Sequence, residues 1–210
     1  MACIVGLLIL SLSPAHHARL LTRRSILAGS TSALLFLPNL RAHARTPGSS
    51  DLREAVEQIR DASVDLRKLQ GEWATYAVID AEGRAGNIDA ARRILGGVAP
   101  QRGMAAIEVA KKTPLYRIDG AFNAVRKAAL DGDPDSWPAG LDLDAFNEAA
   151  ERILFALQKA DGDFYSVVFA SKGTSQLAQI YKEARAQVDN SVNDFECILK
   201  LLQEAGAPGV

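Results

Sequence analysis

The chain has 210 residues, of which 48% are hydrophobic and 23% are charged. This composition allows one domain with a substantial core and argues against a disordered chain, a collagen-like repeat or a disulfide-rich scaffold. The formal net charge of −1 conceals an uneven distribution of charge along the chain.

The first 50 residues have the composition of a targeting segment. They contain five arginines but no lysine and no acidic residue, and the first carboxylate of the chain is Asp51. A short apolar run at residues 4–12 fits the core of a secretory signal, because it is too short to span a bilayer, which takes about 20 residues.

A second apolar stretch follows Arg23 and Arg24, and an A-x-A sequence ends at Ala42 and Ala44. The order of these features resembles a twin-arginine signal with its cleavage site, although an ordinary basic pair is the alternative. We therefore expect residues 1–44 to be a cleaved multipartite targeting leader.

Two apolar segments in one leader are typical of a nucleus-encoded protein of a secondary plastid, which crosses the endoplasmic reticulum, the plastid envelope and the thylakoid membrane in turn. The expected location is the thylakoid lumen. Cleavage after Ala44 leaves residues 45–210 as a single mature domain with 20 basic and 25 acidic residues, a net charge of about −5.

The first expected helix begins at Asp51, which together with Glu54 has the form of a capping box. Residues on one helical face then recur at spacings of three and four, and we expect this helix to end near residues 81–86. The stripe consists of Leu52, Val56, Ile59, Ser63, Leu66, Gln70, Trp73 and Ala77.

Two short helices are expected next, over residues 88–95 and 104–112. Thr113 and Pro114 have the form of an N-cap followed by proline at the first helical position, and they predict the start of the second long helix. The apolar stripe of that helix consists of Leu115, Ile118, Phe122, Val125 and Ala129.

A loop with two prolines and two glycines, residues 131–140, separates the second long helix from the third. The third helix starts near Asp142, and its apolar stripe, the most regular in the chain, runs through Gly162 to Val167. Glycine costs about 1 kcal/mol relative to alanine inside a helix, so a kink or break at Gly162 is the alternative. A fourth helix is expected over residues 174–204, and no alternating strand pattern is present.

Four amphipathic segments with short connections predict an all-α protein. The expected architecture is an antiparallel four-helix up-down bundle with short extra helices between the first and second long helices. Three coiled-coil partners in separate chains are the alternative.

Cofactor and catalytic sites that need histidine or paired cysteines are excluded beyond residue 45, where Cys197 is the only cysteine and no histidine occurs. A di-iron site needs Glu-x-x-His, covalent haem needs C-x-x-C-H, and structural zinc needs several Cys or His ligands. Ser-His-Asp and Cys-His catalysis are excluded on the same ground. We expect no cofactor, no catalytic residue and no metal site.

The remaining candidate sites are weak. Asp131, Asp133 and Asp135 resemble part of a calcium loop, but the twelfth-position glutamate is missing, and a solvated acidic loop explains them better. Asp161 and Asp163 are expected to be a surface pair, and Cys197 a buried structural thiol.

Aromatic side chains are expected mainly in the core, apart from Trp137, which lies in a polar loop and is a candidate interface anchor. The expected core aromatics are Trp73, Phe122, Phe155, Phe164, Tyr165, Phe169, Tyr181 and Phe195.

Charge is segregated along the mature chain. Residues 84–130 carry nine basic and three acidic side chains, a net charge of +6, whereas residues 131–210 carry six basic and fourteen acidic, a net charge of −8. A solvated surface with compensating neighbours is one explanation, and a basic docking surface for an acidic partner is the other. The candidate docking residues are Arg92, Arg93, Lys111, Lys112, Arg117, Arg126, Lys127 and Trp137.

These features together resemble the PsbQ family of extrinsic photosystem II subunits, including the PsbQ-like forms of algae. The resemblance covers about residues 51–205 and rests on the twin-arginine leader, the absence of histidine from the expected mature chain, the four expected helices and the basic segment. The chain departs from plant PsbQ because only Thr46 to Ser50 precede the first helix, where plant PsbQ has a long proline-rich extension.

The resemblance implies a non-catalytic protein that docks on photosystem II at the lumenal face of the thylakoid membrane. It would stabilise the oxygen-evolving complex and the retention of its calcium and chloride, without binding nucleic acid or a small-molecule substrate. The alternatives are a lumenal subunit of photosystem I or of an antenna complex, and a lumenal assembly factor or small-molecule carrier.

Overall fold

The computed structural model describes residues 48–96, 103–132, 137–170 and 173–207. The expected leader, with Arg23, Arg24, Ala42 and Ala44, lies outside the described residues, as do Asp133 and Asp135. In the described part no helix is both long enough and apolar enough to cross a membrane.

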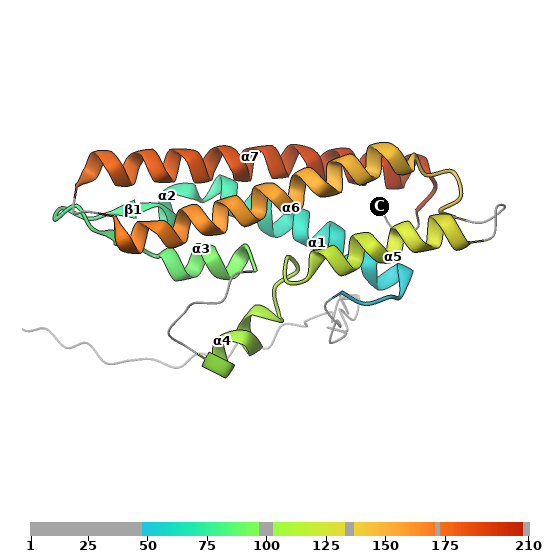
Figure 1. The fold of residues 1–210 in the computed structure, drawn as a ribbon, viewed down its shortest axis with the longest axis horizontal. Helices are drawn as coiled ribbons and strands as arrows, with labels where there is room; N and C mark the ends of the chain where they lie inside the picture. Colours follow the sequence, from blue (N-terminus) through green and yellow to red (C-terminus); the bar gives the residue numbers. More distant parts are fainter. Residues whose placement is uncertain (1–47, 97–102, 133–136, 171–172, 208–210) are drawn as a thin grey trace, which may run out of the picture. The chain divides into compact units, whose positions relative to one another are not determined.

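The described chain is all-α apart from one two-stranded hairpin (Figure 1). The elements are α1 (Leu52–Gly71), α2 (Trp73–Tyr76), β1 (Val78–Ile79), β2 (Ala85–Gly86), α3 (Ile88–Ile94), α4 (Gly103–Ala110), α5 (Ile118–Asp131), α6 (Leu143–Ser166), the 3-10 turn η1 (Val167–Phe169) and α7 (Thr174–Glu204).

Side-chain caps fix the starts of α1 and α6. The Asp51 carboxylate accepts a hydrogen bond from the backbone N–H of Glu54 at 2.9 Å, which confirms the predicted N-cap. The backbone N–H of Asp51 donates to Ser49 Oγ at 3.1 Å, so Ser49 takes the role that the capping box gives to Glu54. Asp142 caps α6 by accepting from the N–H of Ala145 at 3.0 Å.

The first helical segment ends earlier than predicted. Helix α1 stops at Gly71, and the chain continues through α2 into an antiparallel hairpin in which Val78 pairs with Gly86 and Ile79 with Ala85. The expectation that the chain contains no strand was therefore wrong at this point, because two residues per strand are too few to show an alternating pattern.

The prediction that Thr113 and Pro114 start the second long helix was wrong. Thr113 Oγ1 donates to the carbonyl oxygen of Ala110 at 2.7 Å, so its side chain closes the end of α4. Residues 113–117 form a turn, and α5 begins only at Ile118, after Arg117 has adopted a left-handed conformation with φ of 54°.

The last two helices match the sequence closely. Helix α6 continues through Gly162 to Ser166, and α7 spans the predicted residues 174–204. They pack together antiparallel, as contacts between Arg152 and Asp194 near one end and between Phe164 and Tyr181 near the other demonstrate (Figure 1).

Helices α1, α3 and α5 complete the packing. Helix α1 is antiparallel to α7, with Arg67 bonded to Glu196 and Gln70 to Asp189. Helices α3 and α5 each contact both α1 and α6, and they meet α6 at successive levels: Arg92 of α3 at Asp161, and Phe122 of α5 at Phe146.

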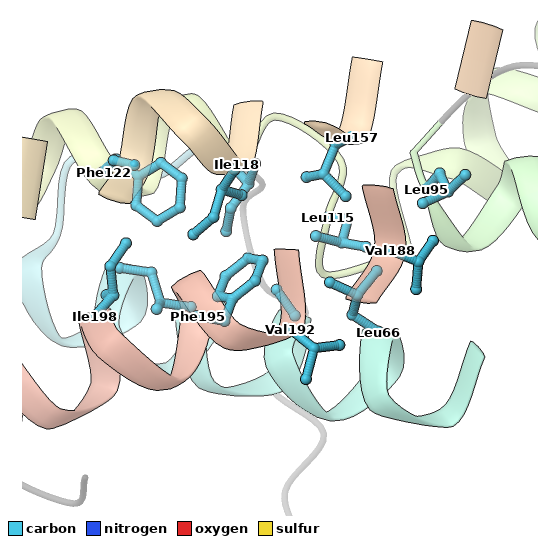
Figure 2. Packing of buried hydrophobic residues seen from close by; sticks show 14 of the residues in the cluster. Leu66, Leu95, Leu115, Ile118, Phe122, Leu157, Val188, Val192, Phe195 and Ile198 are labelled. Atoms are coloured by element: carbon cyan, nitrogen blue, oxygen red, sulfur yellow. The ribbon is translucent and has the colours of Figure 1, made fainter. Parts of the chain in front are cut away.

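The predicted stripes supply most of the core. Figure 2 shows side chains of three helices directed toward the same hydrophobic core: Leu66 of α1, Leu157 of α6, and Val188 and Phe195 of α7. Leu115, from the turn before α5, packs between them. The polar Ser63, which interrupts the first stripe, is buried as well.

Four of the sequence-based burial predictions were wrong. Phe155 and Phe169 are 68% and 70% exposed, and Tyr165 is also exposed. Cys197 lies on the exposed side of α7 beside the apolar stripe, so it is not a buried thiol. In each case the side chain faces solvent, because the helices that pack on α6, η1 and α7 cover only part of their circumference.

Candidate docking surface

Arg92 is unsuited to docking, contrary to its inclusion among the candidate docking residues. Its side chain is only 9% exposed, and its Nε and Nη2 donate to the two carboxylate oxygens of Asp161 at 2.8 and 3.2 Å. Its guanidinium also lies over the ring of Tyr165, 4.9 Å from the centroid. A cation held in this way joins α3 to α6 and is not available to a partner.

Four exposed cations lie at the end of α3 or next to the turn at residues 113–117 in sequence. They are Arg93 in the last turn of α3, Lys111 and Lys112 at the end of α4, and Arg117 at the start of α5. We call these four residues the junction cations. Lys127 is exposed further along α5.

Local contacts orient two of the junction cations without burying them. Arg93 Nε donates to the carbonyl oxygen of Asp89 at 3.1 Å, within α3. Lys111 Nζ lies 2.7 Å from Glu108 Oε1, and this hydrogen bond raises the pKa of Lys111 and lowers the pKa of Glu108. Both groups therefore stay ionised near neutral pH, and Glu108 offsets part of the local positive charge.

Gln58 of α1 holds the backbone of the 113–117 turn. Its Nε2 donates to the carbonyl oxygens of Pro114 and Tyr116, at 2.8 and 3.0 Å, and its Oε1 accepts from the N–H of Gly48 at 3.1 Å. The side chain is almost fully buried. Three segments that are distant in sequence thus meet at one amide whose hydrogen-bonding groups are satisfied.

Glycines let the backbone pass closely at the same place. A Cβ on Gly120 would lie 2.5 Å from the Cα of Gly48, and Gly48 itself has a positive φ of 68°. Gly96, which follows α3 and has a φ of 86°, lies against the backbone of Leu115 and Tyr116. The junction cations therefore project from a backbone that is fixed on several sides.

Nothing in the sequence patterns singled out Gln58. It lies between Val56 and Ile59 in a helix with several other polar residues, and its periodicity places it only at the edge of the stripe. Its partners are backbone carbonyls more than 50 residues away, which leave no trace in the side-chain pattern.

Arg126 and Trp137 are less available than their sequence context suggested. Arg126 is half-buried, and it donates to the side-chain oxygens of Asn147 and Asn123. Trp137 is half-buried and packs against the hydrophobic core, with a buried indole N–H that has no partner among the described residues. Arg126 is therefore a poor candidate for a docking cation, and Trp137 is a poor candidate for an interface anchor.

An open groove of about 560 Å³ runs between the segment before α1 and the outer face of α5. Its lining includes Gly48, Asn123, Lys127 and Asp131. One cation and one anion at its edges favour neither sign of ligand charge, so this groove does not extend the basic surface.

The acidic pair of α6 takes part in ion pairs. Asp161 binds Arg92, and Asp163 binds Lys159 of the same helix at 3.1 Å. Over the described ranges no three Asp, Glu, His or Cys side chains are grouped closely enough to hold a metal ion.

No family model, curated protein or solved structure matches this chain.

Proposed function

We propose that this chain is a non-catalytic extrinsic subunit that docks on the lumenal side of photosystem II. There it stabilises the oxygen-evolving complex and helps to retain calcium and chloride. In this proposal the protein is PsbQ-like, peripheral to the thylakoid membrane of a plastid, and carries no cofactor.

The architecture that we propose is an antiparallel four-helix up-down bundle whose second helix is interrupted. Helices α3 and α5 together supply that second helix, because both contact α1 and α6 and because they meet α6 at successive levels. The segment containing α4 is an insertion between the two halves, which brings additional cations to the interruption. Helix bundles commonly tolerate such insertions at connections.

The group of junction cations is the observation that carries the docking proposal. Three of these cations flank in sequence a turn whose backbone is fixed by Gln58. The fourth, Arg93, lies three residues before Gly96, which packs against the backbone of the same turn. Fixed charges lose less conformational entropy on binding than charges on a mobile loop. A surface of this kind gives register and a fast approach to an acidic partner.

Binding through such exposed charges depends on ionic strength. Charge pairs at the rim of an interface contribute roughly 0 to 1 kcal/mol each, and salt screens them over about 8 to 10 Å. We therefore expect the protein to be released from thylakoid membranes by a high-salt wash and to rebind when the salt is removed.

The test is rebinding of a charge-reversed variant to salt-washed photosystem II membranes. Arg93, Lys111, Lys112 and Arg117 are changed together to glutamate, and Arg92 is left intact because it supports the fold. We expect rebinding to fall at least tenfold, while the far-ultraviolet circular dichroism stays unchanged.

A matched control reverses four exposed cations of α1 and α7, namely Arg53, Lys68, Lys182 and Lys200. Both variants change the formal charge by the same amount, so a selective loss in the first variant reports position and not total charge. Equal rebinding of the two variants would refute the docking surface, and preferential rebinding to photosystem I particles would refute the choice of photosystem II.

A further inference from the structure

An aromatic strip lies exposed on the outer side of α6 and on the η1 turn that follows it. Phe155 and Phe169 are 68% and 70% exposed, and Tyr165 and Val168 are exposed between and beside them. Large exposed apolar side chains grouped on one face of a soluble domain commonly mark an interaction site. The strip lies apart from the junction cations in sequence and serves no part of the docking proposal.

Gly162 lies in the middle of this strip, and the fold of one chain gives no reason for glycine there. The residue is exposed, and a Cβ built on it would have no atom within 4 Å. Glycine inside a helix costs about 1 kcal/mol relative to alanine. Glycine at an exposed helical position permits another backbone to approach closely.

The aromatic residues are spaced evenly about Gly162. Phe155 precedes it by seven residues and Phe169 follows it by seven. Seven residues are about two helical turns, so Phe155 and Gly162 share one face of α6. The η1 turn keeps Phe169 at the end of the same strip, because its ring packs edge-on against Tyr165 at a centroid distance of 5.1 Å.

This spacing fits a two-fold axis. In a symmetric pair of antiparallel helices that cross at Gly162, a residue on the line of contact meets the contact-line residue that lies equally far on the other side of the axis. Phe155 of one copy then meets Phe169 of the other, and Phe169 of the first meets Phe155 of the second.

We propose that the outer face of α6 is a homodimer interface in which a second copy of this chain packs antiparallel about Gly162. The aromatic side chains pack against the second copy, and the absence of a side chain at Gly162 allows the two helix axes to approach. The side chain of Tyr165 is already held in place in the monomer, since Arg92 lies over its ring and Phe169 packs on its edge.

The exposed aromatic area sets the strength of the dimer. A fully buried aromatic side chain covers about 150 to 250 Å², so the exposed parts of the three rings amount to roughly 350 Å² per copy. A standard interface buries about 800 Å² per partner. The dimer is accordingly weak and dependent on concentration.

The first test measures the mass of the full-length chain by sedimentation equilibrium over a range of concentrations. Gly162→Leu places a large side chain at the crossing point, while leucine favours the helix and meets no atom of its own chain near Cβ. We expect at least a tenfold weaker dimer and an unchanged or higher melting temperature. Gly71→Leu is the matched control, because Gly71 is also helical, exposed and without neighbours near its Cβ.

The second test maps the geometry by disulfide cross-linking in a background in which both natural cysteines, Cys3 and Cys197, are changed to serine. Gly162→Cys is expected to cross-link to itself, since this position lies on the two-fold axis. Phe155→Cys mixed with Phe169→Cys is expected to yield the mixed cross-link in preference to either symmetric one. Association through residues 1–44 would be insensitive to substitution at position 162.

Three results of these two tests would overturn the proposal. They are a monomer at every concentration, a dimer that Gly162→Leu leaves as strong as the wild type, and symmetric cross-links at positions 155 and 169. Binding of the monomer to lipid vesicles that is lost on Phe155→Ser and Phe169→Ser would assign the strip to a membrane surface and would equally overturn the dimer. The junction-cation variant is expected to dimerise normally, so failure here is separable from failure of the docking proposal.

Discussion

Arg92 of α3 donates two hydrogen bonds to Asp161 of α6, at 2.8 and 3.2 Å, in a forked pair that is largely shielded from water. Helix α3 has seven residues, too few for an isolated helix to be stable. Its position on α6 therefore depends on this pair, on the contact of Arg92 with Tyr165 and on the buried side chains of Ala91 and Leu95.

Replacement of Arg92 is expected to destabilise the fold. Arg92→Met keeps the aliphatic part of the side chain but leaves the Asp161 carboxylate without its partner, and the free energy of unfolding should fall by about 1.5 to 3 kcal/mol. Urea denaturation followed by circular dichroism measures the change. Arg93→Met, at an exposed position of the same helix, should change stability by no more than about 0.5 kcal/mol. Equal effects of the two substitutions would contradict the structural role of Arg92.

Loss of the Gln58 amide should loosen the 113–117 turn. Gln58→Ala leaves the carbonyl oxygens of Pro114 and Tyr116 and the N–H of Gly48 without their partner, which costs about 1 to 3 kcal/mol. Hydrogen exchange should quicken most at residues 113–117 and near residue 48. Gln70→Ala is the control, because Gln70 bonds to the side chain of Asp189 and not to the 113–117 turn in the described part of the chain. Faster exchange spread evenly over the chain would show that Gln58 does not hold this turn locally.

Two glycines should respond to alanine in opposite directions. Gly120→Ala introduces a Cβ 2.5 Å from the Cα of Gly48, so the segment before α1 must move and stability should fall by about 1 to 3 kcal/mol. Gly71→Ala adds a Cβ in open space inside a helix, and stability should rise by up to about 1 kcal/mol. Thermal melting of both variants measures the difference, and a stabilising Gly120→Ala would show that the two segments do not cross as described.

Alkaline stability should depend on Tyr181. Burial raises the pKa of Tyr181 to about 12, and its hydroxyl donates to the carbonyl oxygen of Val78 at 3.4 Å. The unfolded chain releases this proton near pH 10, whereas the folded chain keeps it, so the stability supplied by the neutral phenol is fully present below about pH 10 and is lost as the pH rises toward 12.

Tyr181→Phe should therefore flatten the fall in stability between about pH 10 and 12. Urea denaturation at a series of pH values measures it, and Tyr116→Phe, which changes a tyrosine outside the core, is the control. An unchanged alkaline slope in the Tyr181 variant would mean that this phenol is not buried in its neutral form.

The long helices were predictable because their signals are local. The N-cap at Asp51 and the span of α7 follow from residues within a few positions of each other in sequence. The same local rules failed at Thr113 and Pro114, where a sequence typical of a helix start closes the helix before it. The competing hydrogen bond from Thr113 to Ala110 is equally local, so the sequence does not choose between the two. In the structure Leu115 is buried and Gln58 bonds to the carbonyl oxygens of Pro114 and Tyr116, and both contacts are with segments distant in sequence.

The sequence predicted the candidate docking surface only as an excess of basic residues in one segment. The sequence by itself determined the all-α class, the excess of cations in residues 84–130 and the absence of histidine beyond residue 45, since each depends on residue type or on spacing along one helix. It could not separate buried Arg92 from exposed Arg93, because adjacent helical positions differ by about 100° and the covering helix is distant in sequence. Tertiary structure alone decided that Arg92 bonds to Asp161 and that Gln58 bonds to the backbone of the 113–117 turn. It also decided that Phe155 and Phe169 stay exposed on either side of Gly162. The physical reason is that burial and pairing depend on which surfaces the other helices cover, and that coverage is set by contacts between segments tens of residues apart.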